Sequence, residues 1–93
     1  MANNLIISYD LNSPGQDYDK IFDKIKSLGS WAKVQKSFWY VKSSLTAAEA
    51  RDKLNSVIDS NDSLIVIDCT NNDAAWFGLN EEVANHLKYK WLD

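Results

Sequence analysis

Two short runs of apolar residues constrain the fold of this chain more than any other feature. The runs are Leu5–Tyr9 and Leu64–Ile67, and in both the alternating positions of a β-strand are apolar on the two sides, apart from Ser8. Strands of this kind lie in a sheet whose two faces are both covered. Other elements of the chain, or a partner, must therefore pack against both sides of these two strands.

Helical spacing and turn signals predict the elements between the runs. One helix carries the apolar stripe Tyr18, Ile21, Phe22, Ile25 and Leu28, and Gly29 is placed to end it. Thr46 and Glu49 form a capping box that opens a second helix, whose stripe is Ala47, Ala50, Leu54, Val57 and Ile58. Trp31–Gln35 and Phe38–Lys42 read as two strands joined by the tight turn Lys36-Ser37.

A third helix is expected at the C-terminal end. Asn80 caps it, and the apolar residues Val83, Ala84, Leu87 and Trp91 form one stripe. The order is then βαββαβ plus this helix, in one domain of 93 residues. We expect an α+β, ferredoxin-like sandwich with the strands in the spatial order four, one, three, two.

One layer of helices leaves the opposite face of such a sheet open. The two-sided apolar runs indicate that this open face is covered, either by the last helix or by a partner subunit. We expect a homodimer.

Asp10 stands where the first strand ends, directly before the polar turn at 12–15. One interpretation is a turn residue that accepts backbone hydrogen bonds. The other is a magnesium ligand, since Mg²⁺ takes one or two protein carboxylates besides water and phosphate oxygens. In the expected topology Asp62 is the acid that comes nearest, whereas Asp68 falls at the opposite edge of the sheet. Asp10 and Asp62 are therefore the candidate metal ligands.

Aromatic and basic residues alternate over the hairpin. Single-stranded nucleic acid is often held by stacking on aromatic rings with local positive charge, which makes Lys33, Lys36, Trp39 and Lys42 candidate nucleic-acid-binding residues. The same pattern also fits core or interface aromatics with a solvated rim of lysines. A net charge of −3 argues against tight non-specific binding to nucleic acid.

Other site chemistries find little support. His86 has no metal-ligand spacing to a cysteine or an acid, and Cys69 is the only cysteine, which excludes an internal disulfide and fits a reducing compartment. The chain has no glycine-rich phosphate loop. No apolar run approaches membrane-spanning length and the N-terminus has no basic segment, so we expect a cytoplasmic protein without membrane contact.

The stretches "LIISYDL", "VQKSFWYVKSSLTAAEARDKL" and "NDSLIVID" resemble the small CRISPR-associated Cas-two family and the virulence-associated protein D ribonuclease toxins over residues 5–68. Small bacterial proteins labelled SinR family share these features and also the segment "DAAWFG". The resemblance implies a ferredoxin-like dimer. It further implies metal-dependent cleavage of phosphodiesters by the strand-end Asp10, with the hairpin Ser37 beside it.

Two functional hypotheses follow. The first is a Cas-two-like homodimer with metal-dependent endonuclease activity on RNA or DNA, in which Asp10 positions a magnesium-bound water and Ser37 and Asp62 assist. The second is a non-catalytic dimer that binds nucleic acid or a protein partner in a defence or toxin system, with Asp10 as a turn residue.

Overall fold

The computed structural model describes residues 2–12 and 18–91, which form four strands and three helices. Their order is β1 (Asn3–Asp10), α1 (Tyr18–Lys26), β2 (Ser30–Gln35), β3 (Phe38–Ser43), α2 (Ala47–Asn55), β4 (Ser63–Asp68) and α3 (Glu81–Lys90). The predicted order of elements is confirmed, with ends that shift by a few residues. The turn expected at 12–15 lies, after its first residue, outside the described residues. No helix in the described part of the chain is long and apolar enough to cross a membrane.

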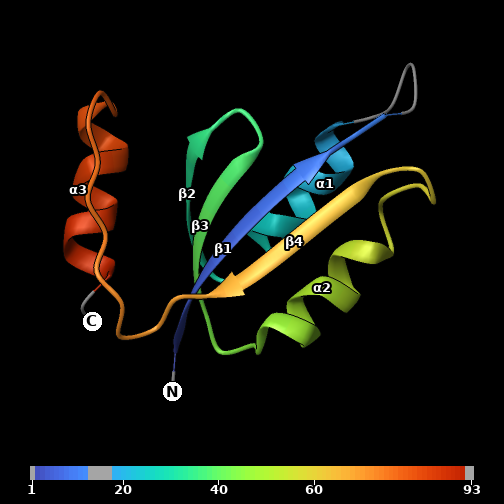
Figure 1. The fold of residues 1–93 in the computed structure, drawn as a ribbon, viewed down its shortest axis with the longest axis horizontal. Coiled ribbons are helices and arrows are strands. Elements are labelled where there is room, and N and C mark those ends of the chain that lie inside the picture. Colours follow the sequence, from blue (N-terminus) through green and yellow to red (C-terminus); the bar gives the residue numbers. More distant parts are fainter. Residues whose placement is uncertain (1, 13–17, 92–93) are drawn as a thin grey trace.

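The four strands form one sheet in the order β2-β3-β1-β4, and every neighbouring pair runs antiparallel. This is the predicted order, read from the other edge. In Figure 1 helix α1 lies behind the sheet and α2 lies beside β4, while α3 stands apart from them beside the β2 edge. The protein is therefore an α+β fold, with two helices on one face of an antiparallel sheet and a third helix against the other.

The main core lies between the sheet and the pair α1 and α2. Its strand residues come from alternate positions of β1 and β3, because those side chains point to one face of the sheet. The buried members of this core are Leu5, Ile7, Tyr9, Ile21, Ile25, Leu28, Trp39, Val41, Ala50 and Leu54. Both helical stripes that the sequence predicts therefore bury their central residues here.

Capping residues fix where two of the helices begin. The Thr46 hydroxyl accepts a hydrogen bond from the Glu49 amide at 3.1 Å, and the Glu49 carboxylate accepts one from the Thr46 amide at 2.9 Å. This is the predicted capping box of α2. The Asn80 side chain accepts a hydrogen bond from the Val83 amide at 2.8 Å and starts α3 in the same manner, as predicted.

Gly29 has a different role from the one that the sequence suggests. Helix α1 ends at Lys26, so Gly29 lies three residues beyond it. A Cβ atom at Gly29 would lie 2.0 Å from the backbone carbonyl oxygen of Lys42 in β3. Glycine is therefore required for the close approach of two backbone segments, and not for a left-handed helix end.

Helix α3 covers one half of the open face, the face of the sheet opposite α1 and α2. The covered half is formed by Ser30, Ala32 and Tyr40 on β2 and β3, where Ala32 is 4% and Tyr40 0% exposed. Leu87 of α3 is buried, and the ring of Trp91 lies 5.2 Å from the ring of Tyr40 between centroids. The last helix thus supplies part of the cover that the sequence requires.

The Asn4 side chain joins β1, β3 and α3 through a buried set of hydrogen bonds. Its amide nitrogen donates to the Trp91 carbonyl at 2.6 Å, and its amide oxygen accepts from the Tyr40 hydroxyl at 2.8 Å and from the Lys42 ammonium at 3.0 Å. Asn4 is 1% exposed. A buried amide of this kind stabilises the fold because its nitrogen and its oxygen both have hydrogen-bond partners.

Candidate functional site

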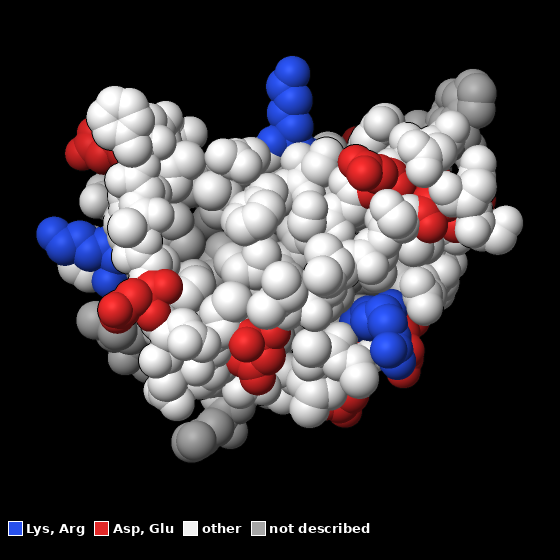
Figure 2. Space-filling view, viewed as in Figure 1, with Lys and Arg blue, Asp and Glu red and all other residues white. Residues whose placement is uncertain are grey.

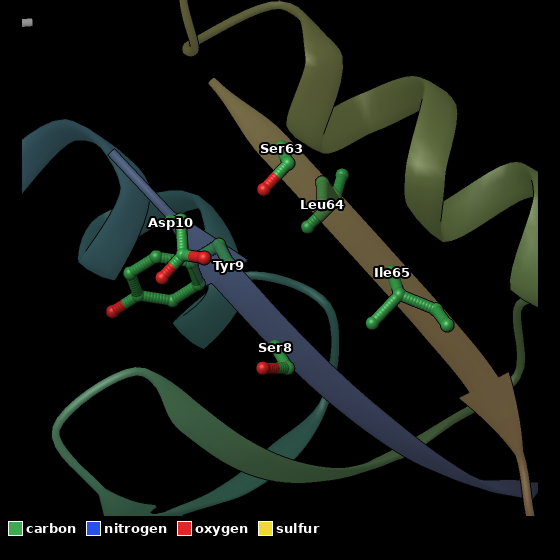
Figure 3. A pocket seen from close by; sticks show the side chains of 6 residues that line it. All are labelled: Ser8, Tyr9, Asp10, Ser63, Leu64 and Ile65. Carbon is green, nitrogen blue, oxygen red and sulfur yellow. The ribbon is translucent and has the colours of Figure 1, made fainter. Parts of the chain in front are cut away.

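Asp10 lies at the end of β1 on the open face, opposite Ser63 of β4 in the pairing of the two strands. Figure 3 shows the Asp10 carboxylate with the hydroxyls of Ser8 and Ser63 beside a small cavity between the ends of β1 and β4. The cavity measures about 200 Å³, and Ile65 forms its apolar side. No hydrogen bond or ion pair to another described residue engages the Asp10 carboxylate. The carboxylate is therefore exposed at the mouth of this cavity.

Asp62 comes close to the end of β1, as the predicted topology requires, but its carboxylate accepts hydrogen bonds from two backbone amides. One oxygen accepts a hydrogen bond from the Asn12 amide at 2.8 Å, and the other accepts one from the Asp59 amide at 2.8 Å. The Asn12 side chain also donates to the Asn61 carbonyl at 2.9 Å. Asp62 therefore ties the segment that follows Asp10 to the loop between α2 and β4.

Ser37 lies in the hairpin turn next to the end of β1. Its backbone carbonyl accepts a hydrogen bond from the Tyr9 amide at 3.2 Å. The Tyr9 hydroxyl points to the same turn, where it contacts the Lys36 carbonyl at 3.4 Å and accepts a hydrogen bond from the Trp39 indole at 3.2 Å. Burial raises the pKa of Tyr9. The hairpin turn and the Asp62 loop thus flank Asp10 on its two sides.

The oxygen ligands at this site are of the type that a hard cation prefers, but there are few of them. A carboxylate and two hydroxyls are oxygen donors, which Mg²⁺ prefers, and Mg²⁺ commonly keeps several waters when few protein ligands are present. Among the described residues, no group of three or more His, Cys, Asp or Glu side chains is arranged to hold a metal ion. Asp10 of one chain would thus supply a single negative charge.

The four candidate nucleic-acid-binding residues do not form one surface. Lys33 and Trp39 pair across β2 and β3 and face the helices, whereas Lys42 points to the open face and donates to Asn4. Trp39 is 1% exposed, so its ring is a core residue and offers no surface on which a base could stack. The Lys33 ammonium lies 4.2 Å from the centroid of the Phe22 ring. Lys36 is exposed in the turn between the strands.

His86 attaches α3 to the edge of the sheet, a role that its sequence context does not indicate. Its Nε2 atom lies 2.9 Å from the Ser30 hydroxyl, and its ring meets the Tyr40 ring edge-on. The Nδ1 atom is buried without a hydrogen-bond partner. Burial, with a contribution from the Lys90 ammonium, lowers the pKa of His86. The neutral imidazole is therefore the form that fits this contact.

The rest of the open face is largely apolar and at least partly exposed. This uncovered half consists of Ile6 and Ser8 on β1 with Ile65 and Ile67 on β4, and the side chains of Ile65 and Ile67 are 55% and 44% exposed. Trp76 and Phe77, in the segment before α3, add exposures of 40% and 100%. In Figure 2 the centre of this view is uncharged, with acidic side chains below it and to its upper right and a basic side chain to its lower right. A patch of this composition is typical of a protein–protein interface.

Sequence reasoning did not single out Trp76 and Phe77 as surface residues. The signal was present, because two adjacent aromatic residues stand in a short segment without strand or helix periodicity, between the polar stretch 70–73 and Asn80. In such a segment a large aromatic side chain has no element that would carry it into the core.

No protein-family model matches the chain, and no solved structure matches it at a significant level.

Proposed function

We propose that the protein is a homodimeric binding module that associates through the uncovered half of its open face. The observation that carries this proposal is the exposure of Ile65 and Ile67 on an otherwise regular strand, beside an uncharged surface. Burying a fully exposed isoleucine contributes about 1.5–3 kcal/mol, so each of these half-exposed side chains contributes roughly half of that. A second copy of the chain offers the same apolar surface, as a two-fold interface requires.

The fold assignment belongs to the same proposal. We assign the chain to the ferredoxin-like, Cas-two-like class, whose members the sequence resembles. The antiparallel strand order β2-β3-β1-β4 and the packing of α1 and α2 on one face support that assignment. Fold alone does not establish an activity, so the binding role rests on the exposed surface.

A matched pair of substitutions tests the binding module. Ile65→Asp places a charge in the proposed interface, and Ala48→Asp adds the same charge on an exposed position of α2. Because an unpaired buried charge costs several kcal/mol, we expect Ile65→Asp to weaken the dimer by about 100-fold or more, with Ala48→Asp close to wild type. Light scattering over a concentration series measures both. Equal masses for the two variants at every concentration would contradict the proposal.

A second candidate function is metal-dependent cleavage of phosphodiesters, and the exposed Asp10 carboxylate favours it. Asp10 lies on the open face, so association through that face would turn the Asp10 side chain of each copy toward the other copy. Asp10, with the Ser8 and Ser63 hydroxyls beside it, would hold Mg²⁺, which lowers the pKa of a bound water and offsets charge on the phosphate. Asp62 would keep Asp10 in place through its two backbone hydrogen bonds.

One isosteric substitution tests this second candidate. Asp10→Asn keeps the shape of the side chain and removes the negative charge that a hard cation requires. Cleavage of RNA and DNA substrates is measured with Mg²⁺ or Mn²⁺ for the wild type, for Asp10→Asn and for Asp23→Asn, which changes an exposed acid of α1. We expect the first variant alone to lose most of the cleavage. Full cleavage by Asp10→Asn would show that Asp10 takes no part in the reaction. If no form cleaves, the nuclease candidate is wrong and only the binding module stands.

A further inference from the structure

Phe77 is held away from the rest of the molecule. Its side chain is 100% exposed, although it is one of the large apolar residues of the chain. The next residue, Gly78, has a φ of 78°, a conformation that side-chain-bearing residues rarely adopt. A Cβ atom at Gly78 would meet nothing within 4 Å, so this glycine serves the turn of the backbone and not close packing. The backbone thus presents the Phe77 ring to solvent.

An apolar cleft lies between the sheet and the segment that carries Phe77. Its floor is formed by Ile6, Val34 and Phe38 of the open face, and its walls include Trp76, Leu87 and Trp91. The cleft measures about 320 Å³. A cavity of about 150 Å³ is enough to hold benzene, so a phenyl ring fits with room to spare. Phe77 itself does not enter this cleft, because its side chain is fully exposed.

We propose that Phe77 of one copy inserts into this cleft of a second copy, and that the partner's Phe77 does the same in return. This inference rests on the proposed homodimer and identifies the contact that determines its geometry. A projecting ring and a cleft that accepts a ring are complementary, and both belong to one chain. A two-fold interface requires this kind of self-complementarity, since each contact occurs twice.

Area favours a second copy as the occupant, and charge does not oppose it. Each chain carries a net charge of −3, so two copies repel wherever acidic residues face one another. The uncharged centre of the face in Figure 2 allows contact without that cost. A buried aromatic side chain covers about 200 Å², so Phe77 and the exposed part of Trp76 would supply roughly a third of the 800 Å² per partner in a stable interface. Ile65 and Ile67 on the neighbouring strand extend the same surface.

Photo-crosslinking locates the ring of Phe77 directly. A benzophenone amino acid at position 77 is irradiated in an equal mixture of ¹⁴N- and ¹⁵N-labelled protein, and the crosslinked peptides are identified by mass spectrometry. We expect mixed-isotope products that join residue 77 to the peptides containing Val34 and Phe38. The same photo-reactive residue at Tyr89, an exposed position of α3, should not label these peptides. Products within one chain only, or products on α1 and α2, would overturn the inference.

Two substitutions separate this inference from the proposed dimer. Phe77→Ala removes the ring from both copies, and we expect the dimer dissociation constant to rise by about 100-fold, or 10-fold for each ring. Tyr89→Ala, which removes an aromatic side chain that is 69% exposed, should leave it unchanged. If the wild type dimerises and Phe77→Ala dimerises equally well, the ring-in-cleft contact is wrong while the dimer stands. If the wild type is a monomer at all concentrations, the dimer and the contact are both wrong.

Discussion

The two halves of the open face have similar strand chemistry and different surroundings. In the covered half Tyr40 is 0% exposed because α3 packs over it. The buried Asn4 amide bonds both the Tyr40 hydroxyl and the carbonyl of Trp91 at the end of α3. In the uncovered half Ile65 and Ile67 are 55% and 44% exposed on an edge strand. A single helix of ten residues is too narrow to cover four strands. The chain therefore covers part of its sheet and leaves the rest for a partner.

The largest effect that we expect concerns the packing of α3 on the covered half. Leu87→Ala removes the one buried side chain of α3 and should lower the free energy of unfolding by about 2–5 kcal/mol. Tyr89→Ala on the same helix changes a side chain that is 69% exposed and should cost about 0.5 kcal/mol or less. Urea denaturation followed by tryptophan fluorescence measures both. Equal stabilities for the two variants would show that α3 does not pack on the sheet.

The second effect concerns the buried hydrogen bonds of Asn4. Asn4→Ala removes the hydrogen bonds that the Asn4 side chain makes with the Tyr40 hydroxyl and the Trp91 carbonyl, which should cost about 1–3 kcal/mol. Asn3→Ala changes the adjacent residue, whose amide donates to the Leu45 carbonyl at 3.0 Å, and serves as the control for the start of β1. Hydrogen exchange of the α3 amides should accelerate in Asn4→Ala and not in Asn3→Ala. The same acceleration in both variants would mean that Asn4 has no special role in holding α3.

The third effect is a dependence of α3 packing on pH. The pKa of His86 is lowered in the folded protein, so below the ordinary pKa of about 6.5 the unfolded chain binds a proton more readily than the folded one. The stability that His86 contributes is therefore complete above that pH and is lost as the pH falls through the folded pKa. His86→Gln keeps a side chain that can bond Ser30 and cannot titrate in this range. The unfolding free energy of the wild type should thus fall relative to that of His86→Gln as the pH drops below 6.5, and a difference that is constant from pH 5 to 8 would contradict this assignment.

The smallest effect on stability is expected on the uncovered half. Ile67→Thr changes a side chain that is 44% exposed, so the unfolding free energy of the monomer should change by no more than about 0.5 kcal/mol. The measurement is made at a concentration where wild type and variant both sediment as monomers. Ile7→Thr on the buried face of β1 provides the contrast and should lose several times more. Similar losses for both substitutions would mean that Ile67 is packed within its own chain.

Local patterns were enough to predict the elements and their order in the sheet. The capping residues Thr46 and Asn80, the hairpin turn at Lys36-Ser37 and the two-sided apolar strands each indicate one element by short-range chemistry. The predicted approach of the Asp62 loop to Asp10 followed from the strand order alone.

The side-chain contacts between distant segments could not be predicted in this way. Asn4 reads as a polar residue near the N-terminus, and only the packing of α3 makes it a buried link. Trp39 and Lys42 were grouped because they lie in one strand, yet they are three positions apart, and an odd separation along a strand places two side chains on opposite faces. The position of α3 decides which half of the open face is covered within the chain. No local sequence pattern indicates where this helix packs.

The central claim is that Ile65 and Ile67 contact a second copy of the chain. Isotope-filtered NMR on an equal mixture of protein with ¹³C-labelled isoleucine methyl groups and unlabelled protein tests it directly. The account predicts intermolecular contacts from the methyl groups of Ile65 and Ile67. It predicts none from those of Ile21 and Ile25, two residues of α1 that are buried against the sheet of their own chain. A sample in which Ile65 and Ile67 show no contact to the unlabelled chain at millimolar concentration would contradict the account.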